Sequence, residues 1–229
     1  MPYRQMCFVL LIALPCADAA PVPKRNVTTE EQIEKLFGKA TIPDKDYLFT
    51  LEDEALRIRV PEKTLKWEKP QDGFSVPRVA QEVKGDFTAI VQIRLSDFPE
   101  KAEVKSVTAG IFVMGDVGTY LEHSRVQMNQ FNQKGKRVRQ GILHTAQNGN
   151  ARGSAGSGGG AFDPDRTYHK LERVGGKVSA YASADGKGWH KLGTWDLELD
   201  ETAKVGLFVG HEGGPCFVEF AEFKITPTK

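Results

Sequence analysis

The sequence predicts an all-β protein, an antiparallel two-sheet β-sandwich with one short helix near the N-terminus. Three observations carry this prediction. From residue 47 onward apolar and polar residues alternate with a period of two, glycine-rich turn signals separate the alternating runs, and no convincing crossover helix lies between them. Alternation is typical of strands with one buried face, and strands without helices between them favour antiparallel sheets.

The first 19 residues have the pattern of a secretory signal peptide. Arg4 precedes an apolar run from Met6 to Leu14, and Ala17-Asp18-Ala19 matches an A-x-A cleavage site. The run is too short for a membrane-spanning helix, which needs roughly 20 residues. The alternative, a buried N-terminal strand, is disfavoured by the same pattern. We therefore expect cleavage after Ala19, a secreted chain (extracellular or periplasmic), and no integral membrane segment after signal removal.

Charge and cysteine content exclude further classes. The chain has 31 basic and 30 acidic residues, a net charge of +1, so no overall field attracts nucleic acid or an anionic membrane. Without residues 1–19 only Cys216 remains, and no internal disulfide can form. About 210 residues can bury a sizeable core without such links.

Residues 20–46 are predicted to form a linker and a short helix. The linker begins with Pro21-Val22-Pro23, which favours an extended chain. Thr28 or Thr29 can cap the helix, acidic residues fill its first turn, and Gly38 ends it. Its apolar stripe consists of Ile33, Leu36 and Phe37. We expect this helix to pack on the main domain.

Residues 47–229 are predicted to form one β-sandwich domain. The clearest strand is 86–95, in which residues 87, 89, 91, 93 and 95 are apolar and share one face. Further strand candidates are 106–115, 177–183, 204–210 and 216–225. Turn signals lie at 84–86, 115–118, 134–135, 175–176 and 185–186. Residues 151–162 are rich in glycine and serine and predict a flexible loop, without the following helix that a phosphate loop needs.

Residues 181–192, YASADGKGWHKL, are the most informative short stretch. Asp185-Gly186 favours a tight turn between two strands, because both residues tolerate positive φ. A calcium loop would need several alternating oxygen ligands and a late acidic residue, yet residues 187–192 include no carboxylate. We therefore predict a hairpin turn here.

The order of motifs around this turn resembles a known group of proteins. Arg173, a glycine turn, S-x-D-G-x-x-W over 183–189, V-G-L-F and a closing F-x-x-F-x-I over 220–225 are similar to the last third of concanavalin A-like lectin/glucanase jelly rolls. The likeness is closest to the secreted family related to regulators of enolase, near the laminin-G-like group. Residues 76–93 and 109–122 resemble that family's strand pair and central hairpin.

The resemblance covers residues 47–229. It implies two antiparallel sheets with a possible ligand face on the concave side. Many relatives bind or cleave carbohydrate, and others do neither.

No complete catalytic motif is found in the sequence. Glucanases of that superfamily carry E-x-D-x-x-E on one strand. The nearest stretch here is 196–201, in which Glu198 and Asp200 match the first two acidic positions, but Ala203 stands where the last glutamate should be. Glu219 and Glu222 share no strand face unless a bulge intervenes. His123, His211 and Glu122 form a metal site only if folding brings them together. We therefore expect no catalysis, no metal and no cofactor, and Cys216 as an inert core thiol.

The function predicted from these observations is a secreted, non-catalytic module that binds a polysaccharide or a glycan-bearing surface. Sugar sites combine an aromatic face with a few fixed polar groups. The predicted carbohydrate-binding residues are Tyr120, Glu122, His123, Arg173 and His211; the wider aromatic and polar set adds Trp67, Trp189 and His190. If the prediction holds, Tyr120, His123 and Arg173 should lie on one concave face.

Two other classes of function stay open. A glycoside hydrolase or lyase with a divergent site would place two carboxylates roughly 5–10 Å apart in a cleft. A structural or interaction domain would expose a large apolar patch. The basic stretch 132–140 is compatible with binding an acidic polysaccharide, although a solvated hairpin tip is favoured in a chain with so little net charge.

Overall fold

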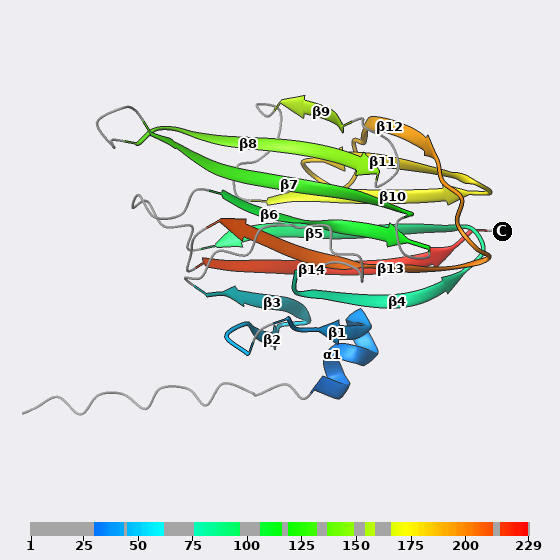
Figure 1. Ribbon diagram of the computed structural model, residues 1–229, viewed down its shortest axis with the longest axis horizontal. Coiled ribbons are helices and arrows are strands. Elements are labelled where there is room, and N and C mark those ends of the chain that lie inside the picture. The colour runs from blue at the N-terminus through cyan, green and yellow to red at the C-terminus, as the bar shows by residue number, and fades with distance from the viewer. Residues whose placement is uncertain are drawn as a thin grey trace, which may run out of the picture.

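The structure is a computed structural model of the chain. It describes residues 30–43, 45–61, 76–96, 106–115, 119–131, 137–148, 154–158, 166–212 and 216–228. Within these ranges one helix, α1 (Glu30–Phe37), accompanies fourteen strands, which form two antiparallel sheets of seven strands each (Figure 1). The predicted all-β sandwich with a short N-terminal helix is therefore confirmed.

The two sheets are named A and B. Sheet A consists, in spatial order, of β1 (Lys39–Thr41), β4 (Arg78–Lys84), β13 (Thr202–Glu212), β6 (Ser106–Met114), β7 (Tyr120–Phe131), β8 (Arg137–Asn148) and β9 (Ser154–Gly158). Sheet B consists of β12 (His190–Asp196), β11 (Lys177–Ser183), β10 (Arg166–Val174), β5 (Phe87–Ser96), β14 (Cys216–Pro227), β3 (Ala55–Val60) and β2 (Leu48–Glu52). Strands that follow each other in the chain often lie in different sheets, as β4 and β5 do.

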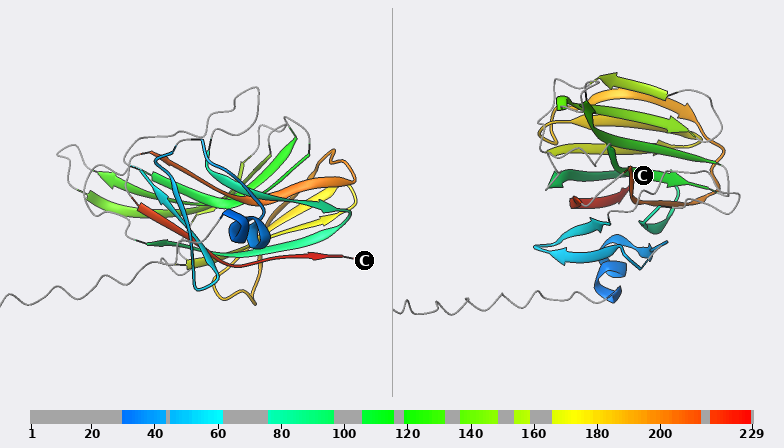
Figure 2. Two further views of the ribbon diagram at one scale, coloured as in Figure 1. Left: turned by 90° about the horizontal axis from the view of Figure 1, so that it is seen from below. Right: turned by 60° about the vertical axis from the view of Figure 1, so that its left-hand side comes forward.

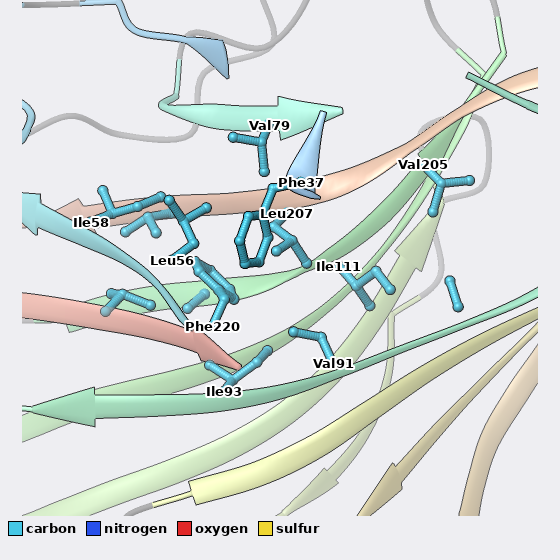
Figure 3. Packing of buried hydrophobic residues seen from close by; sticks show 14 of the residues in the cluster. Phe37, Leu56, Ile58, Val79, Val91, Ile93, Ile111, Val205, Leu207 and Phe220 are labelled. Atoms are coloured by element: carbon cyan, nitrogen blue, oxygen red, sulfur yellow. The ribbon is translucent and has the colours of Figure 1, made fainter. Parts of the chain in front are cut away.

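The core lies between the inner faces of the two sheets. Strand β5 has the predicted alternation, since its apolar residues at 87, 89, 91, 93 and 95 are all buried. Residues of α1, β3, β4, β5, β6, β13 and β14 meet in this core, as the labelled side chains of Figure 3 show. Burial of this continuous apolar layer is the main stabilising contribution to such a sandwich.

Helix α1 lies at the end of the molecule that carries β1 and β2 (Figures 1 and 2). It buries Ile33 and Phe37, and the Phe37 ring stacks on Phe223 at a centroid distance of 6.0 Å. Leu36, which we predicted in the same stripe, is 45% exposed, so that part of the prediction is wrong. The helix is only eight residues long, and two residues one turn apart suffice to anchor it.

Three segments differ from the sequence-based expectation. Residues 154–158 of the glycine- and serine-rich segment form β9, which pairs with β8, so the loop prediction is wrong for these residues. Backbone hydrogen bonding to a long neighbouring strand needs no side chains. Pairing with sheet A also begins upstream of residue 47, because β1 pairs with β4. Residues 197–200 belong to no strand, since β12 ends at Asp196.

No helix in the described part of the chain is long and apolar enough to span a bilayer.

Candidate functional site

The predicted carbohydrate-binding residues on β7 point to opposite sides of sheet A. His123 pairs with Ile111, whose side chain belongs to the core, so His123 faces sheet B. Tyr120 and Glu122 occupy the alternate positions and face away from sheet B. We call the surface on which they lie the outer face of sheet A. A strand's period of two allows no other outcome for neighbouring residues.

His123 belongs to a buried polar cluster between the sheets. Its ring stacks on the ring of His169, with a centroid distance of 3.8 Å, and its Nε2 lies 2.9 Å from the carbonyl oxygen of Tyr181. Beside it, Arg125 Nη1 donates a hydrogen bond of 2.6 Å to Thr167 Oγ1. These contacts join β7 of sheet A to β10 and β11 of sheet B. They give His123 a role in holding the two layers together.

Arg173 and His211 also make structural contacts. The Nη2 atom of Arg173 donates to the carbonyl oxygens of Asp200 at 2.8 Å and Leu199 at 3.3 Å, which holds the segment after β12 against the sandwich. His211 Nε2 lies 2.8 Å from the hydroxyl oxygen of Tyr47 in a buried hydrogen bond. Both side chains therefore help to fix chain segments in place.

The structure does not bring the predicted residues together on one face. The expectation that Tyr120, His123 and Arg173 share a concave face is wrong, because His123 is directed between the sheets and Arg173 holds a chain segment elsewhere. All five predicted residues are at most 8% exposed: Tyr120, Glu122, His123, Arg173 and His211. Trp67 lies outside the described residues. Carbohydrate binding by the five residues stays a prediction, and their burial gives a ligand little access.

Glu122 is the most unusual of the five. It is 8% exposed, and its Oε2 has no hydrogen-bond partner among the described residues. Burial raises the pKa of its carboxyl group from 4.5 to about 8. It lies opposite Phe112, which forms a buried apolar cluster on this outer face with Val76, Tyr120 and Phe208. The surroundings therefore favour the neutral carboxylic acid.

A catalytic pair around Glu122 is not found among the described residues. Glu122, Phe112, Gly206 and Ala80 form one row across β7, β6, β13 and β4. Within two residues of this row on the last three strands, the only other carboxylate is that of Glu82. Three strand spacings separate β4 from β7, about 14 Å, which exceeds the separation used by glycoside hydrolases.

In the described part of the chain, no group of three or more histidine, cysteine, aspartate or glutamate side chains converges into a metal-binding arrangement. Cys216 is buried, and burial raises the pKa of its thiol to about 12, as expected for a core thiol.

The accessible aromatic and polar side chains gather instead on the outer face of sheet B, the face directed away from sheet A. Strand register aligns five residues in one row across five strands: Lys191, Tyr181, Lys170, Ile90 and Lys224. We call this the lysine row. The Lys170 ammonium lies over the ring of Tyr181 at 4.1 Å and over the ring of Trp189 at 5.0 Å. The row therefore combines cationic and aromatic groups at the surface.

The turn after β11 folds over one side of this face. Asp185 Oδ1 accepts hydrogen bonds from the backbone N–H groups of Lys187 at 2.8 Å and Gly188 at 2.9 Å, and from the Ser183 hydroxyl. These bonds lower the pKa of Asp185, with that from Gly188 contributing most. The predicted hairpin turn is confirmed, and the Asp185 oxygen that a calcium ion would need is occupied by the turn itself.

Gly186 brings this turn against Tyr168. Its φ is +73°, and a Cβ atom there would lie 3.3 Å from the edge of the Tyr168 ring. Glycine is therefore favoured both by its backbone conformation and by the close approach.

A bulge in β14 supplies the opposite side. The register of β14 against β5 shifts between Ala221 and Lys224, and Glu222 adopts a positive φ of 53°. The Tyr168 hydroxyl donates to Glu222 Oε1 at 3.1 Å and accepts from Gln92 Nε2 at 2.6 Å, so Glu222 faces outward. A non-glycine residue at positive φ is costly and is often found at functional sites. The extra residue also places Glu222 on the same face as Glu219, which unbroken alternation does not.

Between the turn and the bulge lies an open pocket of about 610 Å³. Its lining residues are Thr88, Ile90, Tyr168, Asp185, Gly186, Lys187, Glu222, Phe223, Lys224 and Thr226. Together with the lysine row this pocket is the candidate site. The sequence indicates Trp189 and the 185–186 turn, and it names Glu222 only as half of a carboxylate pair that needs a bulge. Tyr168, Tyr181 and Lys170 are not predicted as site residues, because they become neighbours only through strand register.

Comparisons with known proteins bear on the fold. No protein-family model matches the chain, and no curated protein matches its sequence. A functionally unknown protein from Saccharomyces cerevisiae superposes with a TM-score of 0.61 at 20% identity, over 83% of this chain and 96% of that one. A mutant of the GH43 protein BlXynB from Bacillus licheniformis gives a TM-score of 0.54 at 16% identity, over 83% of this chain and 38% of the other.

The CBM2 module of the evolved Dit protein of Lactobacillus casei BL23 phage J-1 gives a TM-score of 0.51 at 6% identity, with 78% of each chain covered. These similarities concern the fold alone. They agree with the two-sheet β-sandwich expected from the sequence, whereas the enolase-regulator family is not among the structures named here.

Proposed function

We propose that this protein is a secreted, non-catalytic module that binds carbohydrate through the outer face of sheet B. The single observation that carries the proposal is the open pocket bounded by the Asp185 turn and the Glu222 bulge, beside the lysine row. Secretion rests on the signal-peptide pattern of residues 1–19. Kinship with the secreted family related to regulators of enolase is part of the same proposal.

Polar groups in the pocket and beside it on the same face are held by hydrogen bonds within the protein. Gln92, Tyr168 and Glu222 form a hydrogen-bonded chain, and the Tyr181 hydroxyl donates to Glu172 Oε2 at 3.0 Å. Such fixed groups lose little conformational freedom when a ligand binds. Sugar hydroxyls both donate and accept hydrogen bonds, and the site presents ammonium donors beside carboxylates that internal hydrogen bonds hold in place.

The fold gives additional support. Structural neighbours include a protein described as a carbohydrate-binding module and a protein described as belonging to GH43, so sugar recognition is compatible with this sandwich. The enzymatic alternative is less supported on sheet A, because Glu122 has no second carboxylate nearby among the described residues of its face. On sheet B the pocket holds Asp185 and Glu222, but the Asp185 carboxylate is engaged by the backbone of its own turn. The predicted residues on sheet A and between the sheets are less accessible than the pocket.

The test is a glycan array probed with the chain lacking residues 1–19, combined with an activity screen on β-glucans. We expect retention on at least one glycan class, and no cleavage. Tyr168→Phe removes the hydroxyl from the pocket while keeping its ring, and should weaken retention several-fold. Glu122→Gln on the other sheet should leave retention unchanged.

Two results would contradict the proposal. Loss of retention in the Glu122 variant but not in the Tyr168 variant would move the site to sheet A. Binding to no glycan at all would favour the remaining class of function, a structural or interaction domain.

A further inference from the structure

We propose that the ligand of this face is an acidic glycan, whose carboxylate or sulfate groups are bound by Lys170, Lys187 and Lys224. The inference rests on the proposed function and adds the chemical class of the ligand. It is argued from the charges of the face, their partners and their spacing.

The carboxylates at the site already have hydrogen-bond donors within the protein. Asp185 accepts from its own turn, Glu222 accepts from Tyr168, and Glu172 accepts from Tyr181. An acceptor that is already engaged gains less from a sugar hydroxyl, because an internal hydrogen bond must be exchanged for a new one.

The lysine ammonium groups of the site differ from these carboxylates, because they are not engaged by opposite charges within the described part of the protein. Among the described residues no carboxylate lies within 4.0 Å of the ammonium groups of Lys170, Lys187, Lys191 and Lys224. On the same face Lys177 does have such a partner, since its Nζ lies 2.7 Å from Asp196 Oδ1. The unpaired ammonium groups of the face therefore gather at the pocket and along the lysine row.

Two aromatic rings determine the position of Lys170. Its ammonium lies over Tyr181 at 4.1 Å and Trp189 at 5.0 Å, and Lys191 lies over the Tyr181 ring at 5.7 Å. Cation–π contacts of this kind favour a lysine head held at the ring face. The same contacts cover ring faces that a neutral sugar would need for stacking. The aromatic groups thus position positive charge, which favours an anionic ligand.

The spacing of the row suits a polymer. Lys191, Lys170 and Lys224 occupy every second strand of the row, with Tyr181 and Ile90 between them. Two strand spacings are about 10 Å, so successive ammonium-bearing positions repeat at about that distance. Acidic groups on alternate rings of an extended polysaccharide repeat on a similar scale. A chain lying across the strands would meet several lysines at once, and Lys187 would contact it from the turn.

The experiment measures binding of the chain lacking residues 1–19 to two matched polymer pairs by biolayer interferometry. Polygalacturonate is compared with its methyl ester, which tests carboxylate groups, and dextran sulfate is compared with dextran, which tests sulfate groups. We expect the acidic member of at least one pair to bind about tenfold more tightly than its neutral partner at low salt. Raising the salt from about 0.05 M to about 0.5 M should remove most of that difference through screening.

Matched double variants separate a defined site from general attraction to polyanions. Lys170→Gln with Lys224→Gln should lower affinity for the acidic polymer about tenfold. The control variant, Lys177→Gln with Lys204→Gln, removes the same amount of charge. Lys177 comes from the ion pair with Asp196 and Lys204 from sheet A, so affinity for the acidic polymer should change less than about twofold. Thermal unfolding of both variants checks that the fold is retained, and Lys187→Gln with Lys224→Gln provides a second test without altering the ring contacts.

The possible results distinguish the two proposals. The chain could bind acidic and neutral polymers equally, with no effect of salt or of the Lys170 and Lys224 substitutions. This result leaves the proposal of carbohydrate binding in place and overturns the proposal of an acidic ligand. Equal loss in both double variants also overturns it, because the attraction would then depend only on net charge. Absence of binding to every polymer overturns the proposal of an acidic ligand. If the glycan array also shows no binding, the proposed function is overturned as well.

Discussion

The buried carboxyl group of Glu122 makes the stability of the fold dependent on pH. In the part of the chain that the structure describes its Oε2 has no hydrogen-bond partner, and burial raises the pKa of the carboxyl group from 4.5 to about 8. Glutamine at this position keeps the shape of the side chain and cannot ionise. We therefore predict that Glu122→Gln stabilises the protein at neutral and alkaline pH and has little effect at acidic pH.

The sign and size follow from proton linkage. The folded state holds the Glu122 proton up to about pH 8, whereas the unfolded state releases it near pH 4.5. The wild-type fold therefore loses stability as the pH rises from 4.5 to 8, and no more above that range. Each pKa unit corresponds to about 1.4 kcal/mol, so the full penalty is about 5 kcal/mol above pH 8 and about 3 kcal/mol at pH 7.

Urea unfolding between pH 4.5 and pH 9 measures this penalty. The free energy of unfolding of Glu122→Gln should exceed that of the wild type by a margin that grows with pH and vanishes near pH 4.5. Glu82→Gln is the matched control, since Glu82 lies on the same face of sheet A but is exposed, and its margin should stay near zero. If the difference in unfolding free energy between Glu122→Gln and the wild type does not change with pH, the burial of an unpaired carboxyl group is refuted.

Three further outcomes test the packing. Gly206→Ala should destabilise the fold by about 2–3 kcal/mol in urea unfolding, because a Cβ atom would overlap the backbone carbonyl oxygen of Val79; a change below 0.5 kcal/mol would contradict this close approach. Tyr47→Phe removes the hydroxyl bound to His211 and should cost about 1–2 kcal/mol, whereas a neutral effect would argue against that hydrogen bond. Cys216, the one cysteine left after removal of residues 1–19, should react with a thiol reagent only after unfolding, and rapid labelling of the native chain would count against its burial.

The fold was predictable wherever alternation marked one buried face. Residues 87–95 of β5 and the turn at Asp185-Gly186 follow directly from period two and turn chemistry. Strand β7 was not predictable in this way. Its inward positions carry His123 and Arg125, which hydrogen-bond within the sandwich, so polarity does not reveal which side faces the core.

The candidate site could be predicted only in part. Lys170, Tyr181 and Lys224 come from three strands, and their alignment depends on register, which tertiary packing determines. The position of Glu222 depends on a bulge that no local pattern marks. Simple alternation across residues 216–225 predicts the wrong face for residues after the bulge, because one residue of β14 has no counterpart on β5.

That supernumerary residue of β14 has a wider consequence for the C-terminal end of the chain. Upstream of it Phe220 is buried in the core, and downstream Ile225 packs against the core although the two residues are an odd number apart. Removing Glu222 would leave the downstream register as it is, with Lys224 outward and Ile225 inward, because the strand would then alternate without interruption from Phe220 onward. Such a deletion would thus spare the closing edge of the core and take one acidic wall from the pocket, so that the two parts of the strand can be separated by a single change.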